Sequence, residues 1–247
     1  MTKLQRWVLV AALLALAIFG CAFASAETGG TDGNITWTLS DDGVLTISGN
    51  GAMNDYSTNF VDGDFITSAP WGRGISATSI NILDGVTSIG DCAFYGCTGL
   101  TSITIPDSVT SVGNRVFYEC DCLQSITIPD GVTGIGDEVF CHCTSLTSIT
   151  IPDGVTSIGE LAFSDCTGLT SVTIPDGVTS IGDGAFIRCS GLTGIVIPGS
   201  VISIGKRAFH GCPDLTFTVA RDSYAEQYCK KKGLAYVYAD SLDWLND

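Results

Sequence analysis

Histidine is scarce in this chain of 247 residues, which has only two, His142 and His210. They lie in distant parts of the chain and share no motif. No serine or cysteine lies in a recognisable catalytic motif, and no glycine-rich loop that could cradle a phosphate follows a strand. The sequence therefore predicts a protein that is not an enzyme, and it implies no cofactor.

Positive charge is also scarce. Lys and Arg together number 11 against 26 Asp and Glu, which gives a formal net charge of −15. Nucleic acids and anionic membranes bind proteins mainly through clustered Lys and Arg. We therefore expect no nucleic-acid partner, and we interpret the acidity as a device for solubility.

Long apolar runs are missing except near the N-terminus, where the uncharged residues 7–23 follow Lys3 and Arg6. The run closes on AFASA, and this order of basic, apolar and small residues is typical of a secretory signal peptide. We expect residues 1–26 to be removed by cleavage after Ala26. Two cations and no acid would then be lost, so that the mature chain of 221 residues would have a net charge of −17.

Two alternatives remain open for this segment. The sequence IFGC resembles a lipoprotein signal in which Cys21 would carry the lipid, although the bulky Phe19 is atypical there. The apolar run is also long enough to stay as an uncleaved membrane anchor. No second apolar run follows, so we expect the mature chain not to insert into a membrane and to be secreted or held at the cell surface.

Repetition is what the sequence has in abundance. The stretch TSITIPDGVTSIG at residues 147–159 has near copies 23 residues before and after it, and the shared pattern is LTSITIPDGVTSIGxxAFxxCTG. A fixed period of this length indicates a solenoid in which each unit is one coil. The six complete units begin at Ala77, Leu100, Leu123, Leu146, Leu169 and Leu192, and a broken seventh begins at Leu215.

The positions within a unit suggest structural roles. Apolar residues at positions 4 and 6 alternate with small polar ones, which predicts a strand that the proline at position 7 ends. The Asp-Gly after it is typical of a turn. Val155 and Ile158 predict a second short extended segment, and the spacing of Ala162, Phe163 and Cys166 predicts one helical or 3₁₀ turn. One unit cannot bury its apolar face alone, so neighbouring units must stack.

This pattern resembles the BspA-type leucine-rich repeat, a 23-residue class common in bacterial surface proteins, over residues 77–214. The resemblance implies a β-rich α/β repeat solenoid, that is, a leucine-rich repeat coil stack with a parallel sheet, short helical turns and terminal caps. It also implies a role in adhesion to host matrix proteins or to other cells. No binding residue of the family can be matched to this chain position by position.

The segments that flank the repeats resemble the family's end pieces. Residues 27–34, ETGGTDGN, suggest a flexible linker. Residues 35–76 suggest an N-terminal β cap or leader, with a hairpin across the SDDG at 40–43. Residues 215–247 suggest a C-terminal cap made of a strand, a short helix near 223–232 that ends in lysines, and a final strand.

The cysteines divide into a column at position 21 and four others. Stacked coils place equivalent residues about 4.8 Å apart, but equivalent side chains point the same way rather than toward each other. We therefore expect the column to consist of buried, reduced thiols. The other four are expected to form disulfides, with partners unassigned, because an exported protein meets an oxidising environment. The column is Cys97, Cys120, Cys143, Cys166, Cys189 and Cys212, and the others are Cys92, Cys122, Cys141 and Cys229.

Two patterns could suggest a metal, and each has a simpler explanation. Cys141, His142 and Cys143 are adjacent, but neighbours within one turn cannot all face one ion. The aspartates of the Asp-Gly turns form a ladder that could attract calcium, yet each can bond its own turn and stay hydrated. The DGD at 62–64 lacks the further ligands of a calcium loop, so we expect no metal site. The ladder comprises Asp84, Asp107, Asp130, Asp153 and Asp176.

Positions 3 and 5 are Ser and Thr and face solvent on the expected main sheet. A regular hydroxyl array could hydrogen-bond an extended protein or a glycan, and regular threonines also suit ice binding. The alternative is that Ser and Thr are simply favourable exposed strand residues that stack in ladders. The array comprises Ser102, Thr104, Ser125, Thr127, Ser148, Thr150, Ser171 and Thr173.

The units differ from one another mainly at positions 15–16, 19–20 and 22–23. Aromatic residues and arginines are the usual anchors of binding sites, so this varied edge could discriminate between partners better than the uniform sheet. The alternative is that loops vary because nothing constrains them. The candidate binding residues on this edge are Tyr95, Tyr118, Arg115, Arg188, Arg207 and His210.

Two classes of function remain. The first is a binding or adhesion module for a protein or glycan partner, including host matrix proteins, as the resemblance implies. The second is a structural or spacer protein of the cell surface without a specific ligand, extended or assembled end to end. We expect polar, irregular caps that prevent pairing between strand edges, which predicts a monomer and favours the first class.

Overall fold

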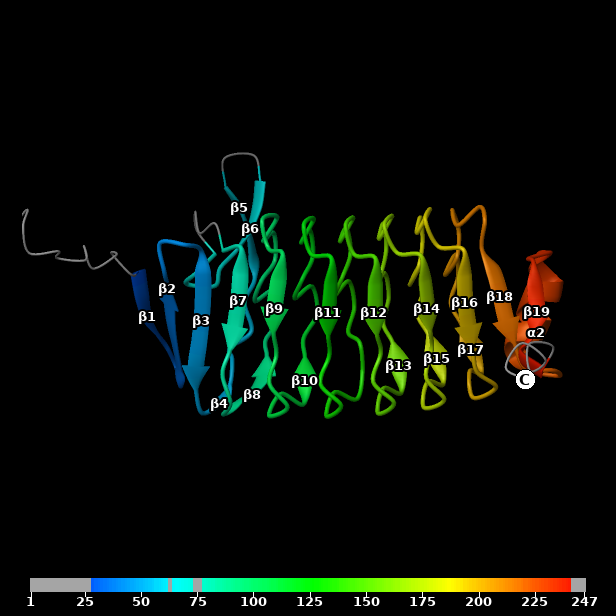
Figure 1. Cartoon of the computed structure of the whole chain (residues 1–247), viewed down its shortest axis with the longest axis horizontal. Helices are drawn as coiled ribbons and strands as arrows, with labels where there is room; N and C mark the ends of the chain where they lie inside the picture. The colour runs from blue at the N-terminus through cyan, green and yellow to red at the C-terminus, as the bar shows by residue number, and fades with distance from the viewer. Residues whose placement is uncertain (1–27, 62–63, 73–76, 241–247) are drawn as a thin grey trace, which may run out of the picture.

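A computed structural model of the chain describes residues 28–61, 64–72 and 77–240. These residues form one straight stack of coils (Figure 1). The expected signal segment, including Cys21, lies outside the described residues, and so does most of the DGD at 62–64. In the part of the chain that the structure describes, no helix is long and apolar enough to cross a membrane.

The main sheet face is a row of strands in chain order along the stack (Figure 1), which hydrogen bonding divides into the sheets β1-β2-β3-β7-β9, β11-β12 and β14-β16-β18-β19. Successive strands in the repeats are parallel and offset by one unit, so that Ser125 pairs with Ser148 and Thr127 with Thr150. This arrangement confirms the predicted parallel-sheet solenoid. Its strands are β7 (Ser79–Ile82), β9 (Ser102–Thr104), β11 (Ser125–Thr127), β12 (Ser148–Thr150), β14 (Ser171–Thr173), β16 (Gly194–Ile197), β18 (Thr216–Val219) and β19 (Tyr236–Tyr238).

A second row of short strands corresponds to the second extended segment expected in each unit. Its members also pair in parallel with a one-unit offset, as Ser157 does with Ser180, and Val155 and Ile158 are buried. One unit contributes only an isolated bridge, between Ile135 and Ile158. The row contains β4 (Gly51–Ala52), β8 (Val86–Ile89), β10 (Ser111–Val112), β13 (Ser157–Ile158), β15 (Ser180–Ile181) and β17 (Ser203–Ile204).

The N-terminal segment is an antiparallel meander that joins the main sheet. The predicted hairpin is present as β2 (Ile35–Leu39) and β3 (Val44–Gly49), and β3 pairs in parallel with β7. The predicted linker is wrong, because β1 (Thr28–Asp32) pairs with β2 over all five of its residues. Its glycines permit this, since a Cβ on Gly30 would lie 3.1 Å from the indole nitrogen of Trp37. A separate hairpin, β5 (Thr58–Val61) and β6 (Asp64–Thr67), projects from the stack (Figure 1).

The core contains a continuous column of aromatic rings. The phenylalanines at position 18 stack from Phe94 to Phe209 with centroids 5.0–5.7 Å apart. Trp71 lies 6.1 Å from the first ring, and Phe217 meets the last ring edge-on at 4.9 Å. The flanking segments therefore cover the two ends of the core that the repeat itself would leave open.

The predicted helical turn after the glycine of position 14 is replaced by a series of tight turns. Leu161 and Asp165 have φ values of 53° and 57°, in the left-handed region. The N–H groups of Leu161 and Phe163 leave their own coil and donate to Asp183 and Ala185 of the next coil, at 3.0 and 2.7 Å. The N–H groups of Ser164 and Cys166 close three-residue turns within the coil, to Leu161 and Phe163. The apolar residues still point inward, but only alternate backbone bonds stay within the coil, so no continuous helix forms.

The cysteine column is built into the contacts between coils. Five of the six thiols, those after the first unit, donate to the carbonyl of the position-18 phenylalanine one unit earlier, for example from Cys143 to Phe117 at 3.1 Å and from Cys166 to Phe140 at 3.0 Å. All ten cysteines among the described residues are free thiols. The reduced column is as predicted, whereas the disulfides expected among the other four cysteines are wrong. Cys92, Cys122 and Cys141 lie at three different positions of their units, and Cys229 lies in the C-terminal helix. The stacking of equivalent positions therefore does not bring any two of these four cysteines together.

The C-terminal cap contains the expected helix, α2 (Tyr224–Lys232), followed by β19. The Ser223 hydroxyl accepts a hydrogen bond from the N–H of Glu226, which is a standard N-cap. Gly233 has a φ of 67° and ends the helix in the left-handed conformation that glycine adopts most readily. The lysines of the last turn lie where positive charge suits the negative end of the helix dipole.

Glu226 ties this helix to the final strand. Its buried carboxylate accepts hydrogen bonds from Lys230 Nζ at 2.7 Å, from the Tyr238 hydroxyl at 2.6 Å and from the N–H of Asp222 at 2.8 Å. The bond from Lys230, followed by the one from Tyr238, lowers the pKa of Glu226 to about 2. The charged carboxylate is therefore the form that stabilises the cap.

We predict a graded reactivity of the thiols toward an alkylating agent in the native protein. Exposed Cys122 should react, while Cys143 and Cys166 should stay unmodified because burial raises their pKa values and keeps water out. Mass spectrometry of the alkylated peptides measures this. After denaturation without reductant all ten cysteines of residues 28–240 should react, and a smaller number would mean that disulfides exist.

The Glu226 carboxylate should make stability depend on pH in a defined window. Because its pKa is lowered in the folded state, its contribution is complete above the unfolded value of about 4.3 and is lost as the pH falls toward 2. Thermal unfolding of the Glu226→Gln variant should therefore differ most from the parent at pH 6, and the two should converge near pH 2. The matched control is Asp214→Asn on the exposed surface of the last repeat unit, and an equal pH dependence of that variant would contradict the assignment.

Candidate functional site

The predicted varied edge is a row of turns, formed by residues 90–97 of the first unit and the equivalent residues of the other five. We call this row the turn edge. Its positions 16 and 20 have positive φ in every unit. Besides glycines, the residues found there are Cys92, Arg115, Glu119, Glu138, His142, Leu161, Asp165, Arg188 and Arg207, and none is β-branched, because such side chains are strained at positive φ.

Position 15 of the turn edge has a structural role. The side chain of Asp91 accepts a hydrogen bond from the N–H of Asn114 at 2.6 Å, and Asn114 does the same for Asp137 at 2.8 Å. Asp137 continues the series to Glu160 at 2.7 Å, and the leader begins it with Asp55. Each side chain thus bonds the backbone one coil further on. In these units, variation at position 15 is therefore limited to side chains, such as Asp and Asn, whose oxygen can accept this hydrogen bond.

Aromatic side chains at position 19 form a short row on the turn edge. Tyr95 and Tyr118 stack with centroids 4.7 Å apart and planes 4° from parallel, and His142 meets Tyr118 edge-on at 5.6 Å. Tyr95 is buried whereas Tyr118 and His142 are half-exposed. Burial raises the pKa of Tyr95 to about 12, with the Glu119 carboxylate adding to the effect. These rings can present a neutral aromatic surface with hydroxyl groups at its rim.

A polar recess lies beside this aromatic row. Arg115 and Glu138 form an ion pair at 2.6 Å across two neighbouring units. Together with Asp91 and Asp137 they line a hollow of about 440 Å³, whose other wall is residues 56–58 of the leader. The recess therefore combines charged groups of three repeat units with a segment that belongs to no repeat.

The remaining candidates of the turn edge lie toward the C-terminal end. Arg188 is exposed and lies 3.8 Å from Asp165. Arg207 and His210 line a second hollow together with residues of α2. The structure thus divides the predicted edge residues into two groups, one around Arg115 and Tyr118 and the other around Arg207.

The hydroxyl array of the main sheet has the arrangement expected from the sequence. All eight of its predicted side chains are exposed, and parallel pairing aligns them in two rows along the stack. Ser102 bonds Ser79 between neighbouring strands at 3.2 Å. The rows end in the sixth unit, where Gly194 and Val196 take the places of Ser171 and Thr173.

The residues weighed as metal ligands are dispersed. Cys141 and Cys143 are buried, while His142 packs on Tyr118. The five aspartates of the Asp-Gly ladder are exposed at successive turns. Among the described residues no three His, Cys, Asp or Glu side chains gather as metal ligands would.

Sequence reasoning missed the walls that the flanking segments supply. Tyr56 in the recess and Tyr228 and Lys232 in the second hollow come from outside the repeats. No periodic signal marks them, because their positions depend on how each flank folds onto the nearest coil. The concentration of Lys and Arg after residue 187 was the available signal for the second hollow.

The repeats match the family described as the BspA type leucine-rich repeat region, over residues 72–190 and 110–229. The fold is similar to a leucine-rich repeat protein from Bacteroides ovatus, with 35% identity over 67% of this chain and a TM-score of 0.57. This chain spans about half, 46%, of that protein. A leucine-rich repeat protein of T. pallidum has 27% identity over 78% of this chain and 81% of its own, also with a TM-score of 0.57. No curated protein of similar sequence was found.

The position-15 ladder gives a testable energy. Replacing Asp137 by Ala removes the acceptor for the N–H of Glu160, and we expect the free energy of unfolding to fall by about 1 kcal/mol. Urea denaturation measures the loss. Asp137→Asn should preserve most of the stability, since Asn114 already fills this role one unit earlier. Glu160→Ala is the second control, because the longer Glu160 side chain makes no such bond in the described structure, and an equal loss there would contradict the ladder.

Proposed function

This chain belongs to the BspA-type leucine-rich repeat family, and we propose that it is an exported or surface-held binding module that attaches to a protein or glycan partner through its turn edge. The family itself suggests a binding or surface role. Export rests on the basic, apolar and small-residue order of residues 1–26. Adhesion to host matrix proteins is the form of binding that the resemblance to the family implies.

The recess around Arg115 is the observation that carries this proposal. Most repeated positions serve the fold, because they fill the core or bond the next coil. Arg115 and Tyr118 have no such duty: Arg115 is exposed and bonds another side chain, and Tyr118 is half-exposed beside it. An arginine and one aromatic ring, that of Tyr56, line a hollow of about 440 Å³, and such residues are the features that binding sites favour.

The hydroxyl array is the second place where a partner could bind. Its groups are evenly spaced and uncharged, so it could hydrogen-bond an extended chain along the sheet. It offers little discrimination, however, because each unit repeats the same two side chains. We therefore propose the turn edge as the specific site and the array as an accessory surface at most.

A structural role is the alternative, and the ends of the stack favour it more than the sequence suggested. The polar, irregular caps expected from the sequence are instead regular strands. Within the described residues β1 and β19 each have a partner on one side only, and such edges can pair with another chain. The monomer thus remains a prediction that light scattering over a range of concentrations can test.

The test is binding of the purified chain to immobilised matrix proteins and glycans at low and physiological salt. Substitutions drawn from the chain's own repeats should keep the fold. Tyr118→Ser copies Ser164, and Arg115→Gly copies Gly184, which has the same positive φ. We expect each to weaken a saturable interaction by roughly tenfold or more, as is typical of hot-spot residues.

The matched control lies on the sheet. Thr150→Val copies Val196 of the same position and should leave binding to the partner unchanged. If Thr150→Val abolishes binding while Arg115→Gly does not, the site is the hydroxyl array. Failure of every immobilised partner to bind, together with growth of particles on concentration, would replace the binding module by the structural role.

A further inference from the structure

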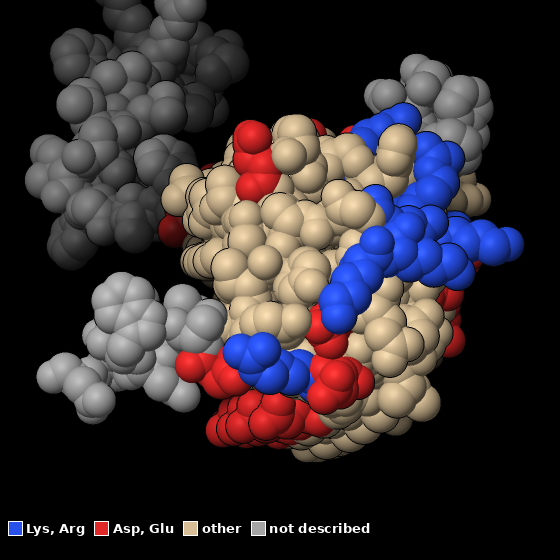
Figure 2. Space-filling view, turned by 90° about the vertical axis from the view of Figure 1, so that its right-hand side faces the viewer, with Lys and Arg blue, Asp and Glu red and all other residues tan. Residues whose placement is uncertain are grey.

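Charge is distributed very unevenly along the stack. Residues 28–187 contain 19 Asp and Glu but only two Lys and Arg, whereas residues 188–247 contain seven Lys and Arg and six Asp and Glu. Figure 2, which views the C-terminal end, shows most of the positive side chains gathered over one part of this end, while a smaller positive group lies against the acidic side chains at the lower edge. Most of the Lys and Arg of this strongly acidic protein are therefore concentrated after residue 187, and we call this part of the chain the basic end.

Some of these cations are already paired. Arg221 bonds Asp240 at 2.7 Å and covers the ring of Tyr238, and Lys230 bonds Glu226 at 2.7 Å. Arg188 lies 3.8 Å from Asp165, and within the described residues no ion pair is found for the side chains of the remaining four cations. These four are Lys206, Arg207, Lys231 and Lys232. Positive charge at this end thus exceeds what the cap uses internally.

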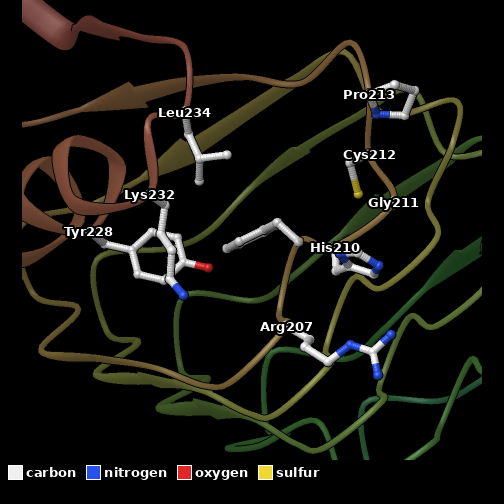
Figure 3. A pocket seen from close by; sticks show the side chains of 9 residues that line it. Arg207, His210, Gly211, Cys212, Pro213, Tyr228, Lys232 and Leu234 are labelled. Carbon is white, nitrogen blue, oxygen red and sulfur yellow. The ribbon is translucent and has the colours of Figure 1, made fainter.

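Two of the unpaired cations face one hollow of about 370 Å³. Arg207 and His210 come from the last repeat unit, and Lys232 and Tyr228 come from α2 on the opposite side (Figure 3). Phe209 and Leu234 contribute apolar surface, and no Asp or Glu among the described residues lines the hollow. We call this hollow the basic pocket.

We propose that the basic pocket binds a carboxylated or sulfated sugar at the end of a glycan. Arg207 and Lys232 can bond a carboxylate or sulfate, since charge-assisted hydrogen bonds are the strong ones. The ring of Tyr228 and the apolar surface beside it suit the C–H face of a pyranose. The volume falls in the range of about 300–1,000 Å³ that small ligands occupy.

The acidity of the rest of the protein favours a short anionic ligand over a long one. A nucleic acid or an extended polyanion gains affinity from many phosphate or sulfate contacts. Beyond the basic end such a chain would meet the acidic surface of residues 28–187 and be repelled. A terminal sugar that enters the pocket end-on avoids this repulsion. The pocket lies at the C-terminal end of the turn edge, apart from the recess around Arg115. It therefore adds a second site to the proposed function, and it is tested by variants that leave the recess intact.

The experiment uses the full chain and matched oligosaccharides. Oligogalacturonate is titrated by calorimetry against the same oligosaccharide with its carboxyls reduced to hydroxyls, and a sulfated derivative forms the third arm. We expect the anionic forms to bind at least about tenfold more tightly than the neutral form. The stronger of the carboxylated and sulfated arms identifies the natural group. Equal binding of the neutral form would overturn the proposal, and so would absence of binding in all three arms.

Neighbouring lysines provide the matched variants. Lys232 lines the pocket and Lys231 does not, although the two substitutions to Ala remove the same charge from the same helix. Lys232→Ala should weaken binding about tenfold and Lys231→Ala less than about threefold. Arg207→Gly, which copies Gly184 with its equivalent positive φ, should act like Lys232→Ala. Equal effects of the two lysines would reduce the site to general electrostatic attraction and overturn it.

Cys212 supplies a second readout that does not depend on heat of binding. Its half-buried thiol lines the pocket, so a bound sugar should slow its alkylation without slowing that of exposed Cys122.

Tighter binding of an oligonucleotide or of anionic vesicles than of the sugars would assign the pocket to those classes instead. Association of chains in low salt that Lys232→Ala abolishes would assign the basic end to the acidic surface of a second copy. Arg115→Gly should change none of these results, which separates this site from the recess.

Discussion

Hydrogen bonding between backbone groups one coil apart is the constraint on which the rest of this structure depends. On the main sheet, in the second row of strands and along the turn edge, N–H groups of one coil donate hydrogen bonds to backbone carbonyl groups of an adjacent coil. The period of 23 residues is kept without insertion, because one extra residue would shift that coil out of register with its neighbours. Close approach enforces it further: a Cβ on Gly159 would lie 2.6 Å from the backbone of Gly136. The requirements of stacking the coils are therefore enough to explain the repeat, without reference to function.

The same constraint decides where chemistry can differ between units. Side chains that bond a neighbouring coil, such as Asp137 and Cys166, can be replaced only by residues that make the same hydrogen bond. At positions 16 and 20 the backbone demands positive φ but leaves the side chain free, so Cys, Arg, Glu and Leu all occur there. Hollows of useful size form where this edge meets a flank, at the recess beside residues 56–58 and at the basic pocket beside α2. The repeats alone present rows of equivalent side chains, and each of these hollows forms where a flanking segment without the repeat supplies its second wall.

Sequence reasoning predicted the parts of the fold that have a period and missed those that do not. The strand columns, the prolines and the reduced cysteine column follow from residue type and spacing. Ala162, Phe163 and Cys166 fit a helical turn as well as the observed tight turns, because both place these residues inward. The distinguishing signal was the glycine at Gly96, Gly184 and Gly211 in the two columns that never contain a β-branched residue. β1 was missed because Thr28–Asp32 lacks the apolar alternation of a strand, and its glycines fit against Trp37 in a way that only the folded leader reveals. The walls of both hollows depend on the same kind of long-range packing.

The basic end can be divided into what the fold needs and what it does not. Lysines at the end of α2 suit the helix dipole, and Lys230 balances the buried Glu226. These charges would be expected in a cap of this design even without a ligand. Arg207 is different, because it belongs to a repeat position at which Gly184 shows that the fold requires no side chain at all. It keeps a charged side chain on a strained backbone, opposite Lys232, and no carboxylate of the described residues lines the hollow that they share. The pocket therefore combines a cation that the cap supplies for its own stability with one that the solenoid has no structural reason to keep.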